Sequence, residues 1–388
     1  MTPAARVQTA IELLEPILDG APAERVLTQW ARKSRFAGSK DRAAIRDHVY
    51  DVLRRKKSAA YSGGGASPRA LMIGLLRLQG IDPEEIFTGI SYAPDQLSES
   101  EKSHSEIGET IDLPNWITAD LKASLGDEFD EIEQHLKNRA PVVVRANLRK
   151  ATREAAKAKL IAEGIKTTEH PASKTALEVQ EGARKIKNSA AFRFGEIELQ
   201  DAASQAAIEM LSKAATDAGL GRVLDYCAGG GGKLLAMAGK FEGRYFAHDA
   251  NPSRLRDLPE RSKRAGVKAK ILATADLSAN AAFDLIFCDV PCSGSGTWRR
   301  DPDAKWKLDR TSLNKTLLIQ RNILSDASSL VRSKGYLAYA TCSLLDAENK
   351  DQISVFLADN PDWQCLYQRS WTPLDGCDGF FTALLQKP

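Results

Sequence analysis

The sequence lacks any hydrophobic run that could cross a membrane, and its cysteines and histidines lack the spacing of a zinc site. No apolar run approaches the roughly 18 residues that a transmembrane helix requires. Glu12 and Glu15 interrupt the amphipathic start of the chain, which is atypical of a signal peptide. The six cysteines form no CxxC pair and have no histidine at ligand spacing, which disfavours a zinc site and a disulfide framework. We therefore expect a cytoplasmic protein with reduced thiols, no membrane segment and no metal.

The chain also has little net charge and no internal repeat at the periods of solenoid proteins. Its 54 Lys and Arg residues nearly balance 51 Asp and Glu, giving a formal charge of +3. A content of 43% hydrophobic and 27% charged residues is typical of soluble globular proteins. Because 388 residues exceed what one hydrophobic core usually organises, we expect more than one domain.

Residues 1–135 are predicted to form an all-α domain, since apolar residues recur there at helical spacing. Basic residues cluster between positions 32 and 57. Five apolar or aromatic residues interleaved with them are expected to face the core: Phe36, Ile45, Val49, Tyr50 and Leu53. The basic residues form either a solvated helix face or a surface that binds phosphates, and the sequence leaves both possibilities open.

Residues 136–200 are predicted to form a small α/β subdomain, and residues 201–388 a larger α/β domain. In the subdomain we expect a strand at 141–147, a helix at 153–162, and short extended segments at 176–179, 192–194 and 197–199. In the larger domain we expect strands at 222–225, 244–249, 267–272, 283–289 and 335–341, with helices from 234 and over 312–331. Strands that alternate with helices predict a doubly wound, mostly parallel sheet.

A reactive turn follows the fourth of these strands. The segment Asp289-Val-Pro-Cys292 places an acid and a thiol three residues apart, where the apolar run 283–288 ends. Ligands of open α/β sheets bind beyond such strand ends. By itself the segment could equally be an ordinary turn that carries a buried cysteine.

The first turn of this sheet, Asp225–Lys233, contains four consecutive glycines, which allow a ligand to approach the backbone closely. Asp249 ends the second strand, where an acid can bind a ribose hydroxyl, and Asp276 follows the third strand, where it suits an adenine amino group. A nicotinamide cofactor would fit this pattern equally well. Leu234 after Lys233 departs from the Walker motif, which disfavours a nucleotide triphosphatase.

A second thiol, Cys342, ends the fifth strand. Neighbouring parallel strands would bring Cys342 and Cys292 to one sheet edge beside Asp289. Two thiols and a carboxylate suit covalent catalysis on cytosine, because a thiolate that adds to C6 makes C5 nucleophilic enough to accept a methyl group.

These stretches resemble the motifs of the RsmB/NOP2/Sun family of RNA cytosine-5 methyltransferases. The resemblance rests on 225–233, on 289–306, on Ala340-Thr-Cys-Ser343 with Glu348-Asn349, and on Asp378-Gly-Phe-Phe381. It implies a Rossmann-like class I methyltransferase domain that binds S-adenosyl-L-methionine. It also implies that Cys342 attacks C6, that Cys292 assists product release, and that Asp289 and Lys233 complete the catalytic group. The implied cofactor-binding residues are Cys227, Ala228, Gly229, Gly230, Gly231, Gly232, Lys233, Asp249, Arg254, Asp276 and Asp289.

The chain departs from the family pattern in the glycine turn. Ala228-Gly229-Gly230 stands where the family usually has Ala-Ala-Pro, so we expect a looser turn and a lower cofactor affinity. Val290 replaces the usual Ala, a small change in packing. The segment 298–306 either positions RNA or braces the loop, and Trp298 and Trp306 either stack on bases or cover the core. Cys227, Cys288, Cys365, Cys377 and His248 are interpreted as packing residues.

The resemblance extends to the other regions in architecture: residues 1–135 are similar to a NusB-like RNA-binding domain, and the small subdomain is similar to an RRM-like insert. The function predicted from these features is methylation of cytosine C5 in small-subunit (16S) ribosomal RNA by a protein that is monomeric. Two alternatives remain, a tRNA cytosine-5 methyltransferase and a non-catalytic RNA-binding assembly factor.

Overall fold

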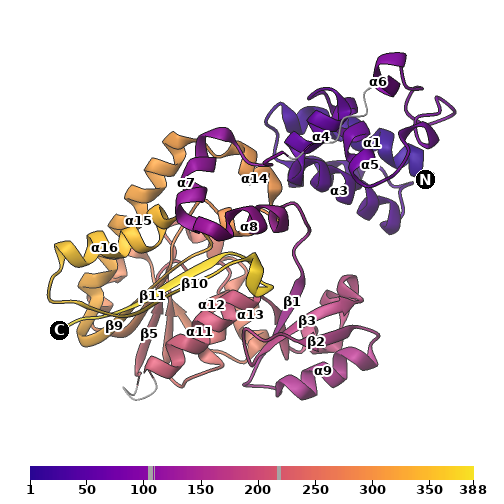
Figure 1. The fold of residues 1–388 in the computed structure, drawn as a ribbon. Coiled ribbons are helices and arrows are strands. Elements are labelled where there is room, and N and C mark those ends of the chain that lie inside the picture. Colours follow the sequence, from indigo (N-terminus) through magenta and orange to yellow (C-terminus); the bar gives the residue numbers. More distant parts are fainter. Residues whose placement is uncertain (104–107, 109, 216–219) are drawn as a thin grey trace. The chain divides into compact units, whose positions relative to one another are not determined.

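The computed structural model describes residues 1–103, 108, 110–215 and 220–388. The described chain divides into two compact units (Figure 1). The helical unit contains 1–139 together with 298–309, and the sheet unit contains 140–297 and 310–388. Among the described residues, no helix is long and apolar enough to cross a membrane.

The helical unit is built from amphipathic helices, of which the first five surround one apolar core. Its helices are α1 (Pro3–Leu18), α2 (Ala23–Lys33), α3 (Ser39–Arg54), α4 (Lys56–Gly63), α5 (Pro68–Leu78), α6 (Glu99–Ser103), α7 (Asn115–Leu125), α8 (Phe129–Leu136) and α14 (Pro302–Lys307). Thr2 and Ser67 cap α1 and α5, since each side chain accepts a hydrogen bond from the first turn. Ile45, Val49 and Leu53 are buried in the core as predicted.

Phe36 corrects the prediction for the basic stretch, because its side chain is 76% exposed and does not face the core. It lies between α2 and α3, in a segment where Arg32, Lys33, Arg35 and Lys40 are also exposed. The helical period of α2 ends before Phe36, so periodicity gave no information on the direction of its side chain.

The segment 298–309 packs into the helical unit. Trp306 donates its indole N–H to the carbonyl of Leu53 at 2.6 Å, and Lys305 donates to the carbonyl of Arg54 at 3.0 Å. Trp298 is 1% exposed, and Trp306 packs against the helical core. The sequence left open whether the two tryptophans stack on bases or cover the core, and the structure shows that both are packed against the protein.

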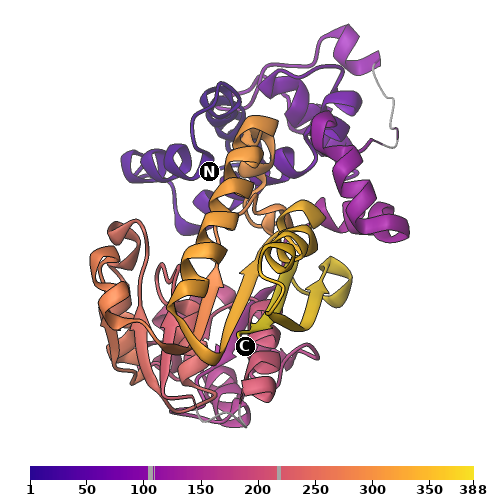
Figure 2. The same cartoon turned by 90° about the vertical axis from the view of Figure 1, so that its left-hand side faces the viewer.

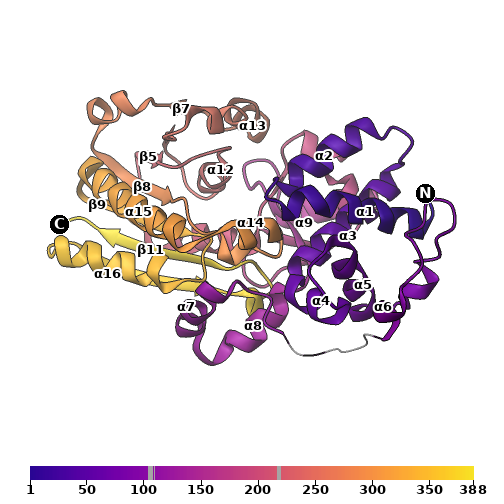
Figure 3. The same cartoon turned by 90° about the horizontal axis from the view of Figure 1, so that it is seen from above.

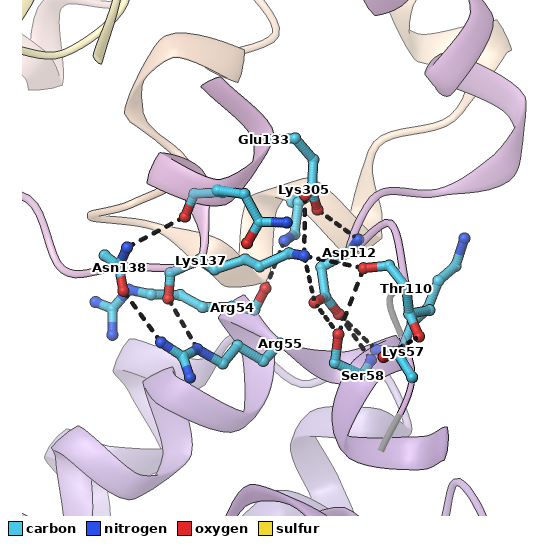
Figure 4. Close-up of polar contacts among 12 residues, drawn as sticks. Arg54, Arg55, Lys57, Ser58, Thr110, Asp112, Glu133, Lys137, Asn138 and Lys305 are labelled. Atoms are coloured by element: carbon cyan, nitrogen blue, oxygen red, sulfur yellow. Dashed lines mark hydrogen bonds and ion pairs between the residues drawn. The ribbon is translucent and has the colours of Figure 1, made fainter. Parts of the chain in front are cut away.

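A buried polar cluster, drawn in Figure 4, ties α4, the stretch 110–112, α8 and α14 together. Asp112 accepts hydrogen bonds from the backbone N–H groups of Lys57 at 2.8 Å and Ser58 at 3.1 Å. Lys137 pairs with Glu133 at 2.9 Å. Burial lowers the pKa of Lys305 in this cluster to about 7, although the carboxylates of Asp112 and Glu133 oppose the shift. Fixed charges and backbone groups thus hold these elements in one arrangement.

The sheet unit begins with a ferredoxin-like subdomain. It contains β1 (Val142–Ala146), α9 (Arg153–Ala162), β2 (Lys166–Glu169), β3 (Ala176–Glu181), α10 (Ala190–Arg193) and β4 (Ile197–Leu199). Among the described residues, the strands form an antiparallel sheet of order β2-β3-β1-β4, which is the βαββαβ arrangement. The extended segment predicted at 192–194 was wrong, because Phe192 and Arg193 belong to α10.

Seven strands among the described residues form the larger sheet, in the order β10-β11-β9-β8-β5-β6-β7. They are β5 (Arg222–Asp225), β6 (Arg244–Ala247), β7 (Ala269–Ile271), β8 (Phe283–Asp289), β9 (Val331–Thr341), β10 (Gln364–Trp371) and β11 (Phe380–Gln386). β5 to β9 are parallel, whereas β10 and β11 are antiparallel. The predicted class, an all-α region with a Rossmann-like α/β domain and a small α/β insert, is confirmed.

Helices cover both faces of this sheet, as in a doubly wound fold. They are α11 (Ala202–Ala215), α12 (Gly232–Ala238) and α13 (Leu258–Ala265) on one face, and α15 (Arg310–Leu330) and α16 (Lys350–Asp359) on the other. Figure 3 shows α12 and α13 on the side of the strands opposite α15 and α16, and Figure 2 shows α15, in orange, running along the strands. Successive strand residues point to opposite faces of the sheet and form one hydrophobic core on each face. The loops that carry the candidate site residues lie at the strand ends.

Candidate active site

The two predicted thiols lie together at the carboxyl ends of neighbouring strands. β8 and β9 are paired in parallel, with Asp289 opposite Ala340, so Cys292 and Cys342 follow the strands at the same level. Their sulfur atoms are 3.2 Å apart, and both are reduced thiols. The sequence prediction that these residues meet at one sheet edge is therefore matched by the geometry.

Lys233 and Asp289 form an ion pair in the same place. The ammonium group of Lys233, on the first turn of α12, lies 2.6 Å from the carboxylate of Asp289. It also lies 5.5 Å from the centre of the Phe380 ring. Burial opposes the charged form, but the carboxylate of Asp289 outweighs it and raises the pKa of Lys233 above its usual value. Lys233 is therefore a permanent cation beside the thiols.

The two thiols differ in acidity. The hydrogen bond from Cys292 lowers the pKa of Cys342, and the charge of Lys233 acts in the same direction, against burial and the negative charges of Asp289 and Glu348. The same hydrogen bond, together with burial, raises the pKa of Cys292 far above its ordinary value. Since Lys233 acts on Cys342, the arrangement favours a thiolate at Cys342 with the S–H group of Cys292 as its donor.

Glu348 holds the two cysteine loops together. Its carboxylate is 0% exposed and accepts hydrogen bonds from the backbone N–H of Ser293 at 2.7 Å and from Gln320 at 3.0 Å. The hydroxyls of Ser293 and Ser343 donate to its second oxygen. Ser293 follows Cys292, and Ser343 follows Cys342, so one carboxylate fixes the residues next to both thiols.

Glycines allow the loop after Cys292 to lie directly against the C-terminal segment. A side chain at Gly296 would place its Cβ 2.2 Å from the carbonyl oxygen of Gly379. The N–H of Gly379 donates to the carbonyl of Gly296 at 2.9 Å, and the N–H of Gly296 donates to the carbonyl of Cys342 at 3.0 Å. This backbone contact gives a structural reason for the Asp378-Gly-Phe-Phe381 motif.

The glycine turn lies at the ends of β5 and β6. Gly229 and Gly231 have φ of +48° and +78°, which side-chain-bearing residues adopt only with strain. The N–H of Gly229 donates to the carboxylate of Asp249 at 3.0 Å. Arg254 lies 3.4 Å from the same carboxylate. Gly229 and Arg254 thus both contact the carboxylate of Asp249. Asp276, in contrast, is exposed in the turn after β7.

Asp225 is a further buried acid that the sequence reasoning did not single out. One carboxylate oxygen accepts from the N–H of Leu234 at 3.1 Å, and the other has no hydrogen-bond partner among the described residues. Burial, reinforced by the charge of Asp289, raises the pKa of Asp225 to about 7. The sequence pattern that could have indicated Asp225 as a site residue is its position as the last residue of a predicted buried strand.

The remaining predicted packing residues have ordinary structural contacts. His248 shares hydrogen bonds with the carbonyl of Tyr226 at 2.8 Å and the hydroxyl of Thr274 at 3.0 Å. Cys288 is buried in the core. Burial raises the pKa of Cys227 well above the ordinary range of a thiol. Within the described residues, no group of three or more His, Cys, Asp or Glu side chains is placed to hold a metal ion.

Comparison with known families agrees with this geometry. Residues 214–386 match the family described as 16S rRNA methyltransferase RsmB/F. Residues 113–185 match the ferredoxin-like domain of RsmF/B-like methyltransferases. The chain belongs to the RsmB/F methyltransferase family. The resemblance inferred from the motifs is therefore confirmed, and the second match covers part of the subdomain formed by β1 to β4.

Named members of the RsmB/F group resemble the chain over most of its length. The chain is 31% identical over 285 residues to ribosomal RNA small subunit methyltransferase B of Proteus mirabilis, and 30% identical over 287 residues to that of Vibrio cholerae. Each match covers 71% of this chain, but the chain spans only 65% of each relative's length. The crystal structure of PH0851, at 23% identity, has the same fold over 100% of this chain and 99% of its own, with a TM-score of 0.78.

Proposed function

We propose that the chain is an RNA cytosine-C5 methyltransferase that uses S-adenosylmethionine and acts on small-subunit ribosomal RNA. The observation that carries the proposal is the 3.2 Å contact between the Cys292 and Cys342 sulfurs beside the Lys233–Asp289 pair. The curated relatives are named as methyltransferases of small-subunit ribosomal RNA, which favours that substrate over tRNA. We further propose that it works in the cytoplasm as a monomer.

Cys342 is proposed as the nucleophile. Its sulfur forms a bond to C6 of the cytosine, and the electron pair displaced from the C5–C6 double bond makes C5 nucleophilic. Asp289, held by Lys233, would hydrogen-bond the base near N3. After methylation, the C5 proton leaves to a base, its electron pair restores the double bond, and the C6–sulfur bond breaks. The S–H of Cys292 can donate to the departing thiolate, which is the role proposed for it.

The glycine turn and its acids fit an adenosyl cofactor. Gly229 and Gly231 shape the turn with their positive φ angles, and Asp249 is a buried acid at the end of β6. The second carboxylate oxygen of Asp225 has no hydrogen-bond partner among the described residues, so it can accept from a ligand. Residues 227–233, Asp249, Arg254, Asp276 and Asp289 are the proposed binding set. S-adenosylmethionine would supply the methyl group there.

The exposed basic residues of the helical unit are proposed to bind RNA. Arg32, Lys33, Arg35 and Lys40 can neutralise phosphates, and the exposed ring of Phe36 can stack on a base. In the domain division that we propose, 1–135 is the NusB-like RNA-binding part, 136–200 the RRM-like insert and 201–388 the methyltransferase domain.

The mechanism is tested with two alanine variants. Incubated with ribosomal RNA and S-adenosylmethionine, the Cys292→Ala protein should accumulate a protein–RNA adduct that survives denaturing electrophoresis. Cys342→Ala should form no adduct and transfer no methyl group. Cys365→Ala, which removes a half-buried thiol on β10, is the control and should behave like the native protein. Normal methylation by Cys342→Ala would refute the assignment of the nucleophile.

The substrate and the alternatives are tested separately. Transfer of a labelled methyl group to purified small-subunit ribosomal RNA but not to tRNA is expected, and the reverse result would favour the tRNA enzyme. A non-catalytic assembly factor would bind RNA without binding S-adenosylmethionine, so calorimetric titration with the cofactor distinguishes it.

A further inference from the structure

A half-buried arginine holds the glycine turn from the side of α13. Arg261, on α13, donates one N–H to the carbonyl of Gly230 at 2.6 Å. Its other terminal nitrogen donates to the carboxylate of Glu198 at 3.1 Å. Glu198 lies on β4 of the ferredoxin-like subdomain and is 3% exposed. Arg264, one turn along α13, also pairs with Glu198. A fixed ionic chain therefore runs from the subdomain to the turn.

A second arginine acts on the same turn from the same subdomain. Arg145, on β1, is 4% exposed and donates to the carbonyl of Gly232 at 2.9 Å. It also donates to the side chain of Gln200. Burial lowers the pKa of Arg145 to about 10, so the guanidinium remains protonated at neutral pH. Two carbonyls of the proposed cofactor turn are thus bound by cations, the buried Arg145 and the half-buried Arg261.

The contact with Arg261 requires glycine at position 230. A Cβ there would lie 2.7 Å from the terminal nitrogen of Arg261, closer than the two atoms can approach. The guanidinium would have to withdraw, because it is the movable end of a flexible side chain. The proline expected at this position from the family pattern would present the same obstacle. At position 230 this chain therefore has a glycine in place of a rigid proline, and Arg261 can reach the carbonyl of that glycine.

We infer that the ferredoxin-like subdomain positions the cofactor turn, through Glu198 and Arg261 and through Arg145. The inference rests on the proposed function, since it assigns these residues to the binding of S-adenosylmethionine by that same site. They touch the backbone of the turn and not the reacting atoms, so they are positioning residues. The subdomain would then serve cofactor binding in addition to any contact with RNA.

A double-mutant cycle tests the inference. S-adenosylhomocysteine is titrated calorimetrically into the native chain, Arg261→Gln, Gly230→Ala and the double variant. Each single change should weaken binding about tenfold, the effect of losing one hydrogen bond to a charged donor. The double variant should be no weaker than either single one, because both changes break the same contact. Arg256→Gln, at a neighbouring site that is 86% exposed, is the control and should bind normally.

Two further measurements separate positioning from misfolding. Hydrogen exchange of the amides at 229–232 should be faster in Arg261→Gln without ligand, while strands β5 and β8 keep native protection. Arg261→Lys should recover part of the affinity. Native affinity in both single variants, or multiplied losses in the double variant, would overturn the inference. Failure of the native chain itself to bind S-adenosylhomocysteine would instead refute the proposed function.

Discussion

Replacement of Glu348 by glutamine should slow methylation, although Glu348 itself touches neither thiol. Its carboxylate accepts from the N–H of Ser293, from Gln320, and from the hydroxyls of Ser293 and Ser343. The two serines lie on the loops that carry Cys292 and Cys342, and Gln320 lies on α15. Glutamine has nearly the same shape, so the substitution changes the hydrogen bonding without opening a cavity.

The expected loss of stability follows from the directions in which the hydrogen-bond donors point. The backbone N–H of Ser293 cannot reverse, so the glutamine oxygen must stay on that side and its NH₂ must face the two serine hydroxyls. Two hydrogen bonds to a charged acceptor are then replaced by neutral ones, which costs about 1–3 kcal/mol. For a domain of this size, that corresponds to a fall of about 2–12 °C in the melting temperature. A shift of about 1 Å in a catalytic group costs up to about a hundredfold in rate, so we expect kcat to fall about 10- to 100-fold.

The assay combines single-turnover methylation of ribosomal RNA, calorimetric melting, and alkylation of the thiols with iodoacetamide over a range of pH. In the native chain the first thiol to react should be Cys342, with a midpoint below that of an ordinary cysteine. In Glu348→Gln this midpoint should change, because the contact with Cys292 loosens and the carboxylate charge that raises the pKa of Cys342 is lost. Asp362→Asn, at an exposed position, is the control. An unchanged kcat together with an unchanged alkylation profile would refute the reasoning.

Three further outcomes follow from the site. Lys233→Met should raise the pKa of Cys342, seen as an upward shift of the alkylation midpoint; an unchanged midpoint would contradict the role of the cation. Asp225, with a pKa raised to about 7 from 3.8, binds its proton more tightly in the folded state. Stability should therefore fall as pH rises from about 4 to 7, by a few kcal/mol, and Asp225→Asn should flatten that dependence in urea denaturation. Gly296→Ala should destabilise the sheet unit by about 1–3 kcal/mol, since its methyl group would lie 2.2 Å from the carbonyl of Gly379; an unchanged melting temperature would disprove that.

Local pattern was sufficient for the parts of the fold whose signal lies within a few residues. The strands predicted at 222–225 and 283–289 match β5 and β8 at both ends, and most of their residues are buried, as in strands covered on both faces. The order of strands and helices then placed Cys292 and Cys342 at neighbouring strand ends. β10, β11, α13 and α16 were not predicted. β10 is mostly exposed or half-buried, so its sequence lacks a continuous apolar run.

The sequence by itself thus determined the family, the class of fold and the presence of two thiols at one sheet edge. Only the tertiary structure decided what surrounds them, because the deciding contacts join residues far apart in the chain. Trp306 binds the carbonyl of Leu53, and Arg261 binds both Glu198 and Gly230. Periodicity and local propensity carry no information about such partners, since each depends on where two separately formed elements meet. The same reason explains why Phe36 was misplaced and why Glu348, a motif residue without an assigned role, proved to join both cysteine loops.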